Sequence, residues 1–565
     1  MVGWTERAVD EACVTALVAA GHSPLQARLL AQRGIPPDAV ATYFKPALTD
    51  LARPDELPAT NEAAAQILSF VRARRRIVVF GDYDCDGICA TAILYTALEA
   101  LAPGTCGRFI PERLSEGYGM SEASVARMLA TFPDVALVVT VDNGINSVAR
   151  IADLKSRGIS VVVTDHHLPG DELPDCLVVN PKVAAPPHLQ GLCGAGVAFM
   201  LSNALVRQAK AEGLYNGPNV GGPLLVMAGL ATVTDIMPIT GQNRILVAEA
   251  LRRFATWAPL GLRELYACAA RTGTVSMTSK DFGFLLGPRI NAAGRMSDGR
   301  EALGLVLSAD RETARDLARR VDLHNTKRKS VEQEMTERAL AQVVPGAAAQ
   351  VIDLLEGHQG VAGIVASRVL EKLGPANEVP VCVIVGGHGS ARAPKGYNVR
   401  DAFVASAEVL DRFGGHAAAG GFCVREGCVE RFRTLFCDAC ARQAADAGAI
   451  QPGTRTFDAW VSAPDLTLAF AEWLRQMEPF GEGNPEPVFA MHDVLLSDAR
   501  PLGQDGQHLL VTLRGKDMPR AVWWHRGDLV EQLRAEAARP RDIVFTVEIS
   551  TYGEPHVELR LQALQ

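Results

Sequence analysis

A cluster of acidic residues is the first feature of the sequence that could carry chemistry. Asp82, Asp84 and Asp86 fall within five residues, directly after the apolar run Ile77–Phe80. Such a run is typical of a buried strand, and ionised carboxylates at its end repel one another in a poorly solvated place. The spacing therefore predicts that a bound cation neutralises these three side chains.

Other acidic and imidazole side chains follow the same pattern further along the chain. They are Asp142 after residues 135–141, then Asp165, His166 and His167 after residues 159–163, and Asp235 in the apolar segment 231–238. In an open parallel sheet, the carboxyl ends of the strands form the ligand crevice, so these groups are expected to meet. Oxygen ligands with one or two imidazoles suit Mn²⁺ or Mg²⁺ better than a thiolate zinc site.

Each piece also has an ordinary explanation. The acidic triplet alone could be a calcium loop, although it lacks the later glutamate of an EF-hand and follows a buried strand. Asp142-Asn143-Gly144 is a common turn signal, the histidine pair could be structural, and Asp235 could be a helix-end acid. All four occur in order and mostly at strand ends, which favours one shared metal site.

The elements that must position these residues can be read from the apolar pattern. Continuous rather than alternating apolar runs at residues 77–80, 135–141, 159–163 and 176–179 indicate strands buried on both faces, hence a parallel sheet. The charged stretch 309–342 predicts a long connecting helix, and residues 348–445 predict a second α/β unit. Short strand-like runs after residue 453 predict a small β-barrel.

Composition sets the outer limits. The chain has 565 residues, which exceeds the length that a single hydrophobic core usually supports. A content of 48% hydrophobic and 21% charged residues is typical of globular protein. The net charge of −8 excludes a global basic field, so a polyanion must be bound locally. Twelve cysteines are sparse, the start is polar, and no apolar stretch reaches the ~18 residues of a membrane span. We therefore expect a cytoplasmic protein without a membrane segment.

The four motifs resemble those of the DHH phosphoesterase superfamily. Further segments resemble the RecJ family within it, and the resemblance covers roughly residues 30–565. Those segments are residues 287–295, 360–368, 389–392, 412–416 and 479–487. Cys85 stands where alanine or valine is commoner, which changes packing more than ligation.

The resemblance implies a domain order. We expect an α/β protein with an N-terminal extension and four further parts: a parallel-sheet DHH domain, a long connecting helix, a second α/β DHH-associated domain, and a C-terminal OB-type β-barrel. The expected limits are residues 1–55, 56–305, 306–345, 346–447 and 454–565.

The resemblance also implies an activity. We expect a two-metal phosphodiesterase that degrades single-stranded DNA from the 5′ end and releases 5′-mononucleotides in DNA recombination and repair. One alternative is a DHH phosphoesterase acting on small nucleotides or oligoribonucleotides, but those relatives commonly carry HxNPDxD where this chain has Phe80–Asp86. A catalytically idle nucleic-acid-binding protein ranks last, because no ligand position is lost.

The implied metal centre holds two ions of Mn²⁺ or Mg²⁺. Its implied ligands are Asp82, Asp84, Asp86, Asp142, His166 and Asp235, with Asp142 as the expected bridge and the division between the two ions left open. His167 is expected to bind the phosphate or protonate the leaving oxygen, with service as a third ligand as the alternative. Asp165 is expected to orient a histidine.

The implied DNA contacts lie in several segments. Arg113, Ser390 and Arg392 are expected to bind the 5′ phosphate, because planar guanidinium groups suit bidentate phosphate binding. Tyr118 is either a base-stacking residue or an ordinary partly buried aromatic. The remaining candidates for contact with DNA are Arg289, Asn291 and Arg295 for backbone phosphates, and Gly414, Gly415 and His416 for close approach of the strand, with a structural turn as the alternative for the glycines. Trp523, Trp524, Tyr552 and His508 are candidates for stacking in the barrel, with the barrel core as the alternative.

Partners are implied by the resemblance alone. They are single-stranded DNA, a single-strand-binding protein and a RecQ-type helicase, and the protein is expected to be a monomer.

Overall fold

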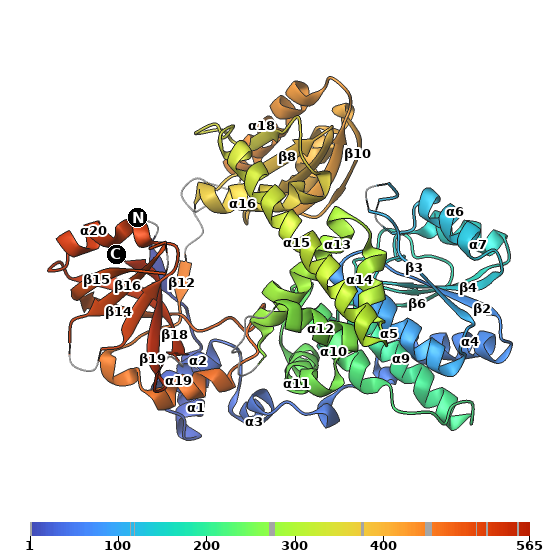
Figure 1. Cartoon of the computed structure of the whole chain (residues 1–565), viewed down its shortest axis with the longest axis horizontal. Helices are drawn as coiled ribbons and strands as arrows, with labels where there is room; N and C mark the ends of the chain where they lie inside the picture. Colours follow the sequence, from blue (N-terminus) through green and yellow to red (C-terminus); the bar gives the residue numbers. More distant parts are fainter. Residues whose placement is uncertain are drawn as a thin grey trace. The chain divides into compact units, whose positions relative to one another are not determined.

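A computed structural model describes residues 3–113, 115–117, 119–269, 277–374, 378–446, 455–503, 505–515, 518–550 and 553–564. The chain forms two compact units (Figure 1). The smaller unit comprises Met1–Asp50, Pro238–Thr240 and Thr454–Gln565, and the larger comprises Leu51–Met237 and Gly241–Gly453. Within the described part of the chain, none of the helices combines the length and apolar character needed to cross a membrane.

The larger unit begins with a parallel sheet of five strands in the order β3-β2-β4-β5-β6. Every residue of β4 is buried, which confirms that the continuous apolar runs are strands covered on both faces. The strands are β2 (Arg76–Phe80), β3 (Cys106–Phe109), β4 (Val135–Val141), β5 (Ser160–Thr164) and β6 (Leu177–Val179).

Helices cover both faces of this sheet (Figure 1). On one face, α6 (Glu122–Thr131) and α7 (Val148–Ser156) share an apolar core with Val78, Val138 and Val161. On the other, α4 (Thr60–Arg72), α5 (Cys85–Leu101) and α9 (Gly194–Ala211) pack together and onto the strands. Next to α5 and α9 lies α10 (Gly221–Thr234), which packs in turn on α11 (Gly241–Trp257).

A thirty-residue helix, α15 (Arg311–Leu340), links the two α/β parts of the larger unit, as predicted from the charged stretch. It begins at Asp310, whose carboxylate accepts a hydrogen bond from the Thr313 amide at 2.8 Å and so caps the helix. One end packs on the neighbouring helices and the other on α16 (Ala362–Leu373). Those neighbours are α12 (Leu260–Ala269), α13 (Gly287–Met296) and α14 (Gly299–Val306); a π-helix, η5 (Asp281–Leu286), leads into α13.

The second α/β part has a mixed sheet in the order β10-β11-β9-β8-β7. Only β7 and β8 pair in parallel, and the other neighbours are antiparallel. One face packs on α16, and the other packs on α17 (Val399–Ala405) and α18 (Val429–Asp446). The strands are β7 (Gln350–Asp353), β8 (Val381–Val385), β9 (His388–Arg392), β10 (Leu410–Gly415) and β11 (Ala419–Val424).

The smaller unit is built on the expected C-terminal β structure. Seven strands follow the order β13-β14-β18-β19-β17-β16-β15, and among the described residues no pairing joins the two outer strands, so the OB-type sheet stays open. The strands are β13 (Ala459–Trp460), β14 (Phe489–Val494), β15 (Leu496–Leu502), β16 (His508–Leu513), β17 (Arg520–Trp523), β18 (Arg541–Ser550) and β19 (His556–Leu564), with helices α19 (Leu468–Gln476) and α20 (Val530–Ala535).

The N-terminal segment belongs to this smaller unit rather than to the α/β part that follows it in sequence. Strand β1 (Trp4–Glu6) pairs with β12 (Arg455–Phe457), and helices α1 (Glu11–Ala19), α2 (Pro24–Ala31) and α3 (Val40–Phe44) share a core with the C-terminal strands. Asp458 holds the two ends of the chain together, lying 3.1 Å from the Arg7 guanidinium and 3.8 Å from that of Arg33.

Candidate metal centre and adjoining cavity

The three clustered aspartates lie where β2 turns into α5. Asp82 is 2% exposed, and Asp84 caps α5 by accepting a hydrogen bond from the Gly87 amide at 3.0 Å. Asp86 lies in the first turn of the helix and is also buried. The strand-to-helix turn therefore holds all three carboxylates at the carboxyl end of the sheet, as the sequence predicts.

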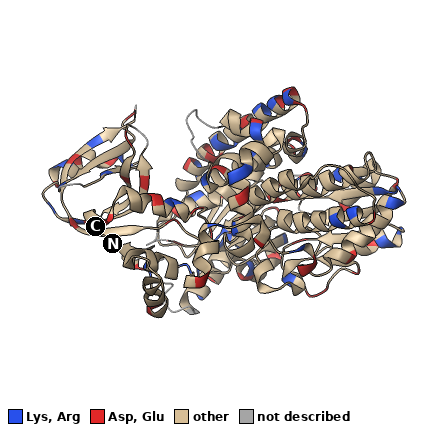
Figure 2. Ribbon diagram, turned by 90° about the horizontal axis from the view of Figure 1, so that it is seen from below, with Lys and Arg blue, Asp and Glu red and all other residues tan. Residues whose placement is uncertain are grey.

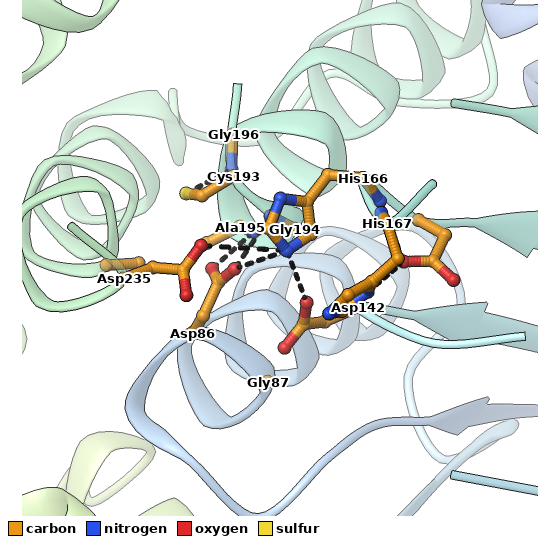
Figure 3. Close-up of polar contacts among 12 residues, drawn as sticks. Asp86, Gly87, Asp142, His166, His167, Cys193, Gly194, Ala195, Gly196 and Asp235 are labelled. Atoms are coloured by element: carbon orange, nitrogen blue, oxygen red, sulfur yellow. Dashed lines mark hydrogen bonds and ion pairs between the residues drawn. The ribbon is translucent and has the colours of Figure 1, made fainter. Parts of the chain in front are cut away.

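Asp86 is held by the amino end of a second helix (Figure 3). The amides of Gly194 and Ala195, the first residues of α9, each donate to one of its carboxylate oxygens at 2.7 Å. Exposed amides and the positive end of the helix dipole favour an anion there. Neither residue was predicted from the sequence, although the glycine-rich segment Gly191–Gly196 is a typical start of such a helix.

The other motifs converge on His166, which follows β5. Its Nε2 lies 3.1 Å from an Asp142 oxygen, 3.6 Å from an Asp86 oxygen and 3.6 Å from an Asp235 oxygen (Figure 3). Asp142 follows β4 with a left-handed φ of +60°, and Asp235 caps the carboxyl end of α10. Four segments that are distant in sequence thus bring their side chains to one place.

Burial makes this cluster unstable without cations. Burial, followed by the charges of neighbouring carboxylates, raises the pKa of Asp82, Asp84 and Asp142, and raises that of Asp235 to about 8. Burial also lowers the pKa of His166, which favours the neutral imidazole that metals bind.

The donor set fits divalent cations. Asp82 Oδ1 and His166 Nε2 are buried and have no hydrogen-bond partner among the described residues. Three sets of ligand atoms lie within 4.8 Å of one another: Asp82, Asp84 and Asp142; Asp86, His166 and Asp235; and Asp142, His166 and His167. Carboxylate oxygens with imidazole nitrogen are the ligands expected for Mn²⁺ or Mg²⁺.

His167 is fixed by its neighbour Asp165. Its Nδ1 lies 2.7 Å from Asp165 Oδ1, while the other oxygen of Asp165 accepts the Ile145 amide at 3.0 Å. Burial opposes the charged imidazole, but the hydrogen bond and charge of Asp165 raise the pKa of His167 to about 9. Asp165 therefore orients a cationic histidine beside the carboxylates, whereas its own pKa is lowered by that partner despite burial.

Gly194 allows the amino end of α9 to approach Asp142. A Cβ at this position would lie 2.6 Å from both the Cβ and the Oδ1 of Asp142, closer than van der Waals contact permits. We expect Gly194→Ala to displace Asp142 and to lower the metal-dependent activity of this site by about 100-fold, the upper range for changes to groups that orient metal ligands. Steady-state kinetics would measure the loss. Gly213 has open space around it, but Gly213→Ala is not a neutral control, because the left-handed φ of +72° there strains any residue other than glycine. Ala209→Gly, on α9 like Gly194, is the better comparison, because it tests whether a change in helix stability alone lowers activity. Similar losses in Gly194→Ala and Ala209→Gly would contradict the steric explanation.

A cavity of about 330 Å³ adjoins the acidic turn within the larger unit. Its walls come from the turn after β2, the segment after β3, the amino end of α16 and strands β9, β10 and β11. The lining residues are Tyr83, Arg113, Gln359, Gly360, Ala362, His388, Gly389, Ser390, Arg412, Phe413, Gly414, Gly421 and Phe422. Of these, Arg113, Ser390 and Gly414 were predicted from the sequence.

Arg113 and Arg412 line this cavity, and Arg295 and Arg392 lie close to Arg113. Burial, followed by the charge of Arg113, lowers the pKa of Arg295 to about 10 and also lowers that of Arg392. Arg392 lies beside the start of α16, because a Cβ on Gly363 would come within 2.9 Å of its guanidinium and 3.4 Å of Ser390 Oγ. Arg295 donates to the Gly360 carbonyl at 3.3 Å and Arg392 to the Ala391 carbonyl at 2.8 Å. Guanidinium groups gathered at a helix amino end form a site for an anion.

Some predicted contacts are not brought to this cavity. Arg289 donates to Asp322 and to the Leu285 carbonyl, each at 2.8 Å, so its guanidinium is held against α15. Asn291 accepts the Cys85 amide at 2.7 Å and thereby docks α13 on the acidic turn. His416 lies in the exposed turn between β10 and β11, next to Gly415. Tyr118 lies outside the described residues.

The smaller unit presents part of the predicted aromatic set. Trp524 is 42% exposed, with the His508 ring 4.5 Å away and the Arg560 guanidinium 5.7 Å from its ring centre. Trp523 instead packs partly against the core, and Tyr552 lies outside the described residues.

Comparison with known proteins gives matches over most of the chain. Residues 76–219 match the DHH family, N-terminal domain, and residues 457–563 match the RecJ OB domain. The single-stranded-DNA-specific exonuclease RecJ of Thermus thermophilus is 37% identical over 85% of this chain and 68% of that protein. The RecJ of Salmonella typhimurium is 34% identical over 85% of each chain.

The fold agrees with these matches. A crystal structure of Thermus thermophilus RecJ in complex with Mn²⁺ matches all of this chain and 79% of that chain, with a TM-score of 0.83 and 32% identity. Three findings agree with one another: the family match at the acidic turn, the match of the C-terminal unit and the similarity over the whole length. The chain therefore belongs to the RecJ family of single-stranded-DNA-specific exonucleases.

Proposed function

We propose that this protein is a metal-dependent exonuclease that degrades single-stranded DNA from its 5′ end and releases 5′-mononucleotides. The observation that carries the proposal is the convergence of four motifs on buried ligand atoms beside a cavity rich in arginine. Basic and acidic residues are interspersed over both units (Figure 2), so the attraction for phosphate is local, as the net charge predicts.

We propose that Asp82, Asp84, Asp86, Asp142, His166 and Asp235 hold two divalent ions, Mn²⁺ or Mg²⁺. Such ions polarise the phosphoryl oxygens and offset charge on the attacking and leaving oxygens. Asp142 and His166 each belong to two of the three ligand sets, and of the two only Asp142 has a second side-chain oxygen, so it would be the residue able to serve both ions. The amides of α9 hold Asp86, and Asp165 holds His167 so that it donates a hydrogen bond to the phosphate or a proton to the leaving oxygen.

The adjoining cavity is proposed to bind the terminal phosphate. Arg113 and Ser390 line it, and Arg392 lies directly behind Ser390 and the start of α16. Arg295 is close enough to Asp84 and Arg113 for its pKa to respond to both. A strand whose 5′ phosphate enters this cavity presents its first internucleotide bond toward the acidic turn, which explains degradation from that end.

End-labelled oligonucleotides test the proposal. With Mn²⁺, a 5′-phosphorylated single strand labelled at its 3′ end should shorten stepwise from the 5′ end, and blunt duplex should stay largely intact. Shortening from the 3′ end would contradict the polarity. Turnover confined to dinucleotides would favour the alternative function, that of the small-substrate phosphoesterases, which commonly carry the HxNPDxD motif.

Arg392→Ala is expected to reduce the preference for a 5′ phosphate over a 5′ hydroxyl by about tenfold, the effect of losing one charge-assisted contact of ~1.4 kcal/mol. Initial rates on the two matched oligonucleotides would measure it. Arg431→Ala, which removes an exposed guanidinium paired with Glu408 on the same part of the chain, should keep the preference. Equal loss on both substrates would remove Arg392 from phosphate recognition.

Further parts of the proposal concern the rest of the chain. Trp524, with His508 and Arg560 beside it, is proposed to stack on bases of the strand, as aromatic residues of OB-folds do. The same proposal includes the domain limits expected from the sequence and action as a monomer in the cytoplasm. It also includes work with a single-strand-binding protein and a RecQ-type helicase. Size-exclusion chromatography and pull-down with purified partners would test the last points.

A further inference from the structure

Tyr83 links the metal-binding turn to the phosphate cavity. It lies between Asp82 and Asp84, two of the proposed ligands, and its side chain lines the cavity. The guanidinium carbon of Arg113 lies 4.9 Å from the centre of its ring. A cation at this distance over an aromatic ring is attracted by the negative face of the π system.

Arg113 depends on this ring for its position. Across the described residues, no carboxylate pairs with Arg113 and no hydrogen bond holds its guanidinium. Its acidic neighbours are engaged elsewhere, since Glu112 pairs with Arg300 and Glu116 with Arg127. Arg295 and Arg392 are near enough to repel it, because each has its pKa lowered by the charge of Arg113. The Tyr83 ring, together with the charge of Asp82, offsets this repulsion, and a contact with the face of the ring leaves the N–H groups of the guanidinium available to a ligand.

Tyr83 is itself firmly placed. A Cβ on Gly294 would lie 2.6 Å from the Tyr83 carbonyl oxygen and 3.2 Å from its Cβ, so α13 packs directly against the residue. Asn291 on the same helix accepts the Cys85 amide at 2.7 Å, two residues further along the turn. The backbone and Cβ of Tyr83 are therefore held by α13 on the same turn that carries the metal-binding carboxylates.

We propose that Tyr83 is a positioning residue for end recognition: its ring holds Arg113 over the cavity, and so sets the terminal phosphate at a fixed place relative to the metal-binding turn. The inference rests on the proposed function, since it assumes that Arg113 binds the 5′ phosphate. Tyr83, which lies between two proposed metal ligands, thereby acts in substrate selection rather than in metal ligation.

Binding without turnover gives the first test. The affinities of wild type and Tyr83→Leu are measured by fluorescence anisotropy with EDTA, using oligonucleotides labelled at the 3′ end that carry a 5′ phosphate or a 5′ hydroxyl. We expect Tyr83→Leu to reduce the ratio of the two affinities by about tenfold, because a desolvated cation–π contact is lost. Tyr83→Phe keeps the ring and should keep the ratio within about twofold.

A second aromatic pair in the same domain supplies the matched control. Arg108 lies 4.8 Å from the ring of Tyr95 on α5, away from the lining of the cavity. Tyr95→Leu removes a contact of the same kind and should leave the affinity ratio unchanged. If Tyr83→Leu does not fold, 3,4,5-trifluorophenylalanine at position 83 keeps the size of the ring and removes its negative face, so the ratio should fall as for leucine.

A double-mutant cycle then isolates the pair. In an Arg113→Gln background, Tyr83→Leu should cause no further fall in the ratio, because the residue acts through Arg113. An unchanged ratio in Tyr83→Leu or in the fluorinated variant would overturn the positioning role, as would an equal further fall in the Arg113→Gln background. Failure of the proposed function looks different: wild type itself would bind both oligonucleotides equally.

Discussion

Asp142→Asn is expected to lower nuclease activity on single-stranded DNA by on the order of 10³-fold or more, since several kcal/mol of charge stabilisation depend on the metal centre. Asp142 belongs to two of the three ligand sets, and one of its oxygens lies 3.1 Å from His166 Nε2. Asparagine is the suitable replacement because the backbone at this position has φ of +60°, a conformation that asparagine adopts at low cost.

The loss in Asp142→Asn should not come from unfolding. Asparagine removes one negative charge from a buried cluster in which burial and the neighbouring carboxylates raise the pKa of Asp142, so the metal-free variant should melt at or above the wild-type temperature. Circular dichroism in EDTA would measure this. Asp153→Asn on α7, whose carboxylate pairs with Arg157 near the surface, is the matched control and should keep full activity. Retained turnover in Asp142→Asn would remove this residue from the metal centre.

Mn²⁺ is expected to raise the melting temperature of the larger unit, and more so at pH 8.5 than at pH 5.5. The carboxyl groups of Asp82, Asp84, Asp142 and Asp235 have raised pKa values in the folded chain, about 8 for Asp235. A group whose pKa is raised by folding contributes stability that is complete below its unfolded pKa of about 4 and is lost as the pH rises through its folded pKa. Metal-free protein therefore loses stability between these limits.

Divalent ions bind the deprotonated carboxylates and restore that stability at high pH. At a free ion concentration of 100 times Kd, the gain is about 2.7 kcal/mol. Thermal unfolding followed with EDTA or Mn²⁺ at both pH values would measure the difference, with Asp142→Asn as the variant expected to respond less. A shift of equal size at both pH values would show that these carboxyl groups are not the ones that bind.

The agreement between sequence and structure is closest where the pattern is local. The run Val135–Val141 is a fully buried strand because its residues are apolar except Thr140, which leaves no face for solvent. The stretch 309–342 is one helix because it is rich in charged, helix-favouring residues and has no strand pattern. Three of the four acidic motifs could be placed at strand ends for the same reason, since each follows such a run, whereas Asp235 ends helix α10.

Contacts between distant segments were not predictable in this way. The amides of Gly194 and Ala195 that hold Asp86 come from a helix that begins 108 residues later in the chain. Arg289 and Arg295 lie on the same helix, α13, and appear equivalent in the sequence, yet one is held by Asp322 and the other is half-buried near Asp84. The N-terminal segment pairs with residues 455–457, although its apolar pattern fits any apolar partner.

The sequence by itself determined the chemistry: which side chains are available to bind cations, their order at the ends of buried strands, and the alternation of elements that makes a parallel sheet. These depend on residue type and on spacing along the chain. The tertiary structure alone decided which groups meet: His166 within 3.6 Å of three carboxylates, Arg113 over the ring of Tyr83, and a cavity of about 330 Å³ between segments far apart in sequence. The physical reason is that the packing of helices on sheets sets distances between segments, and a single chain pattern is compatible with many such packings.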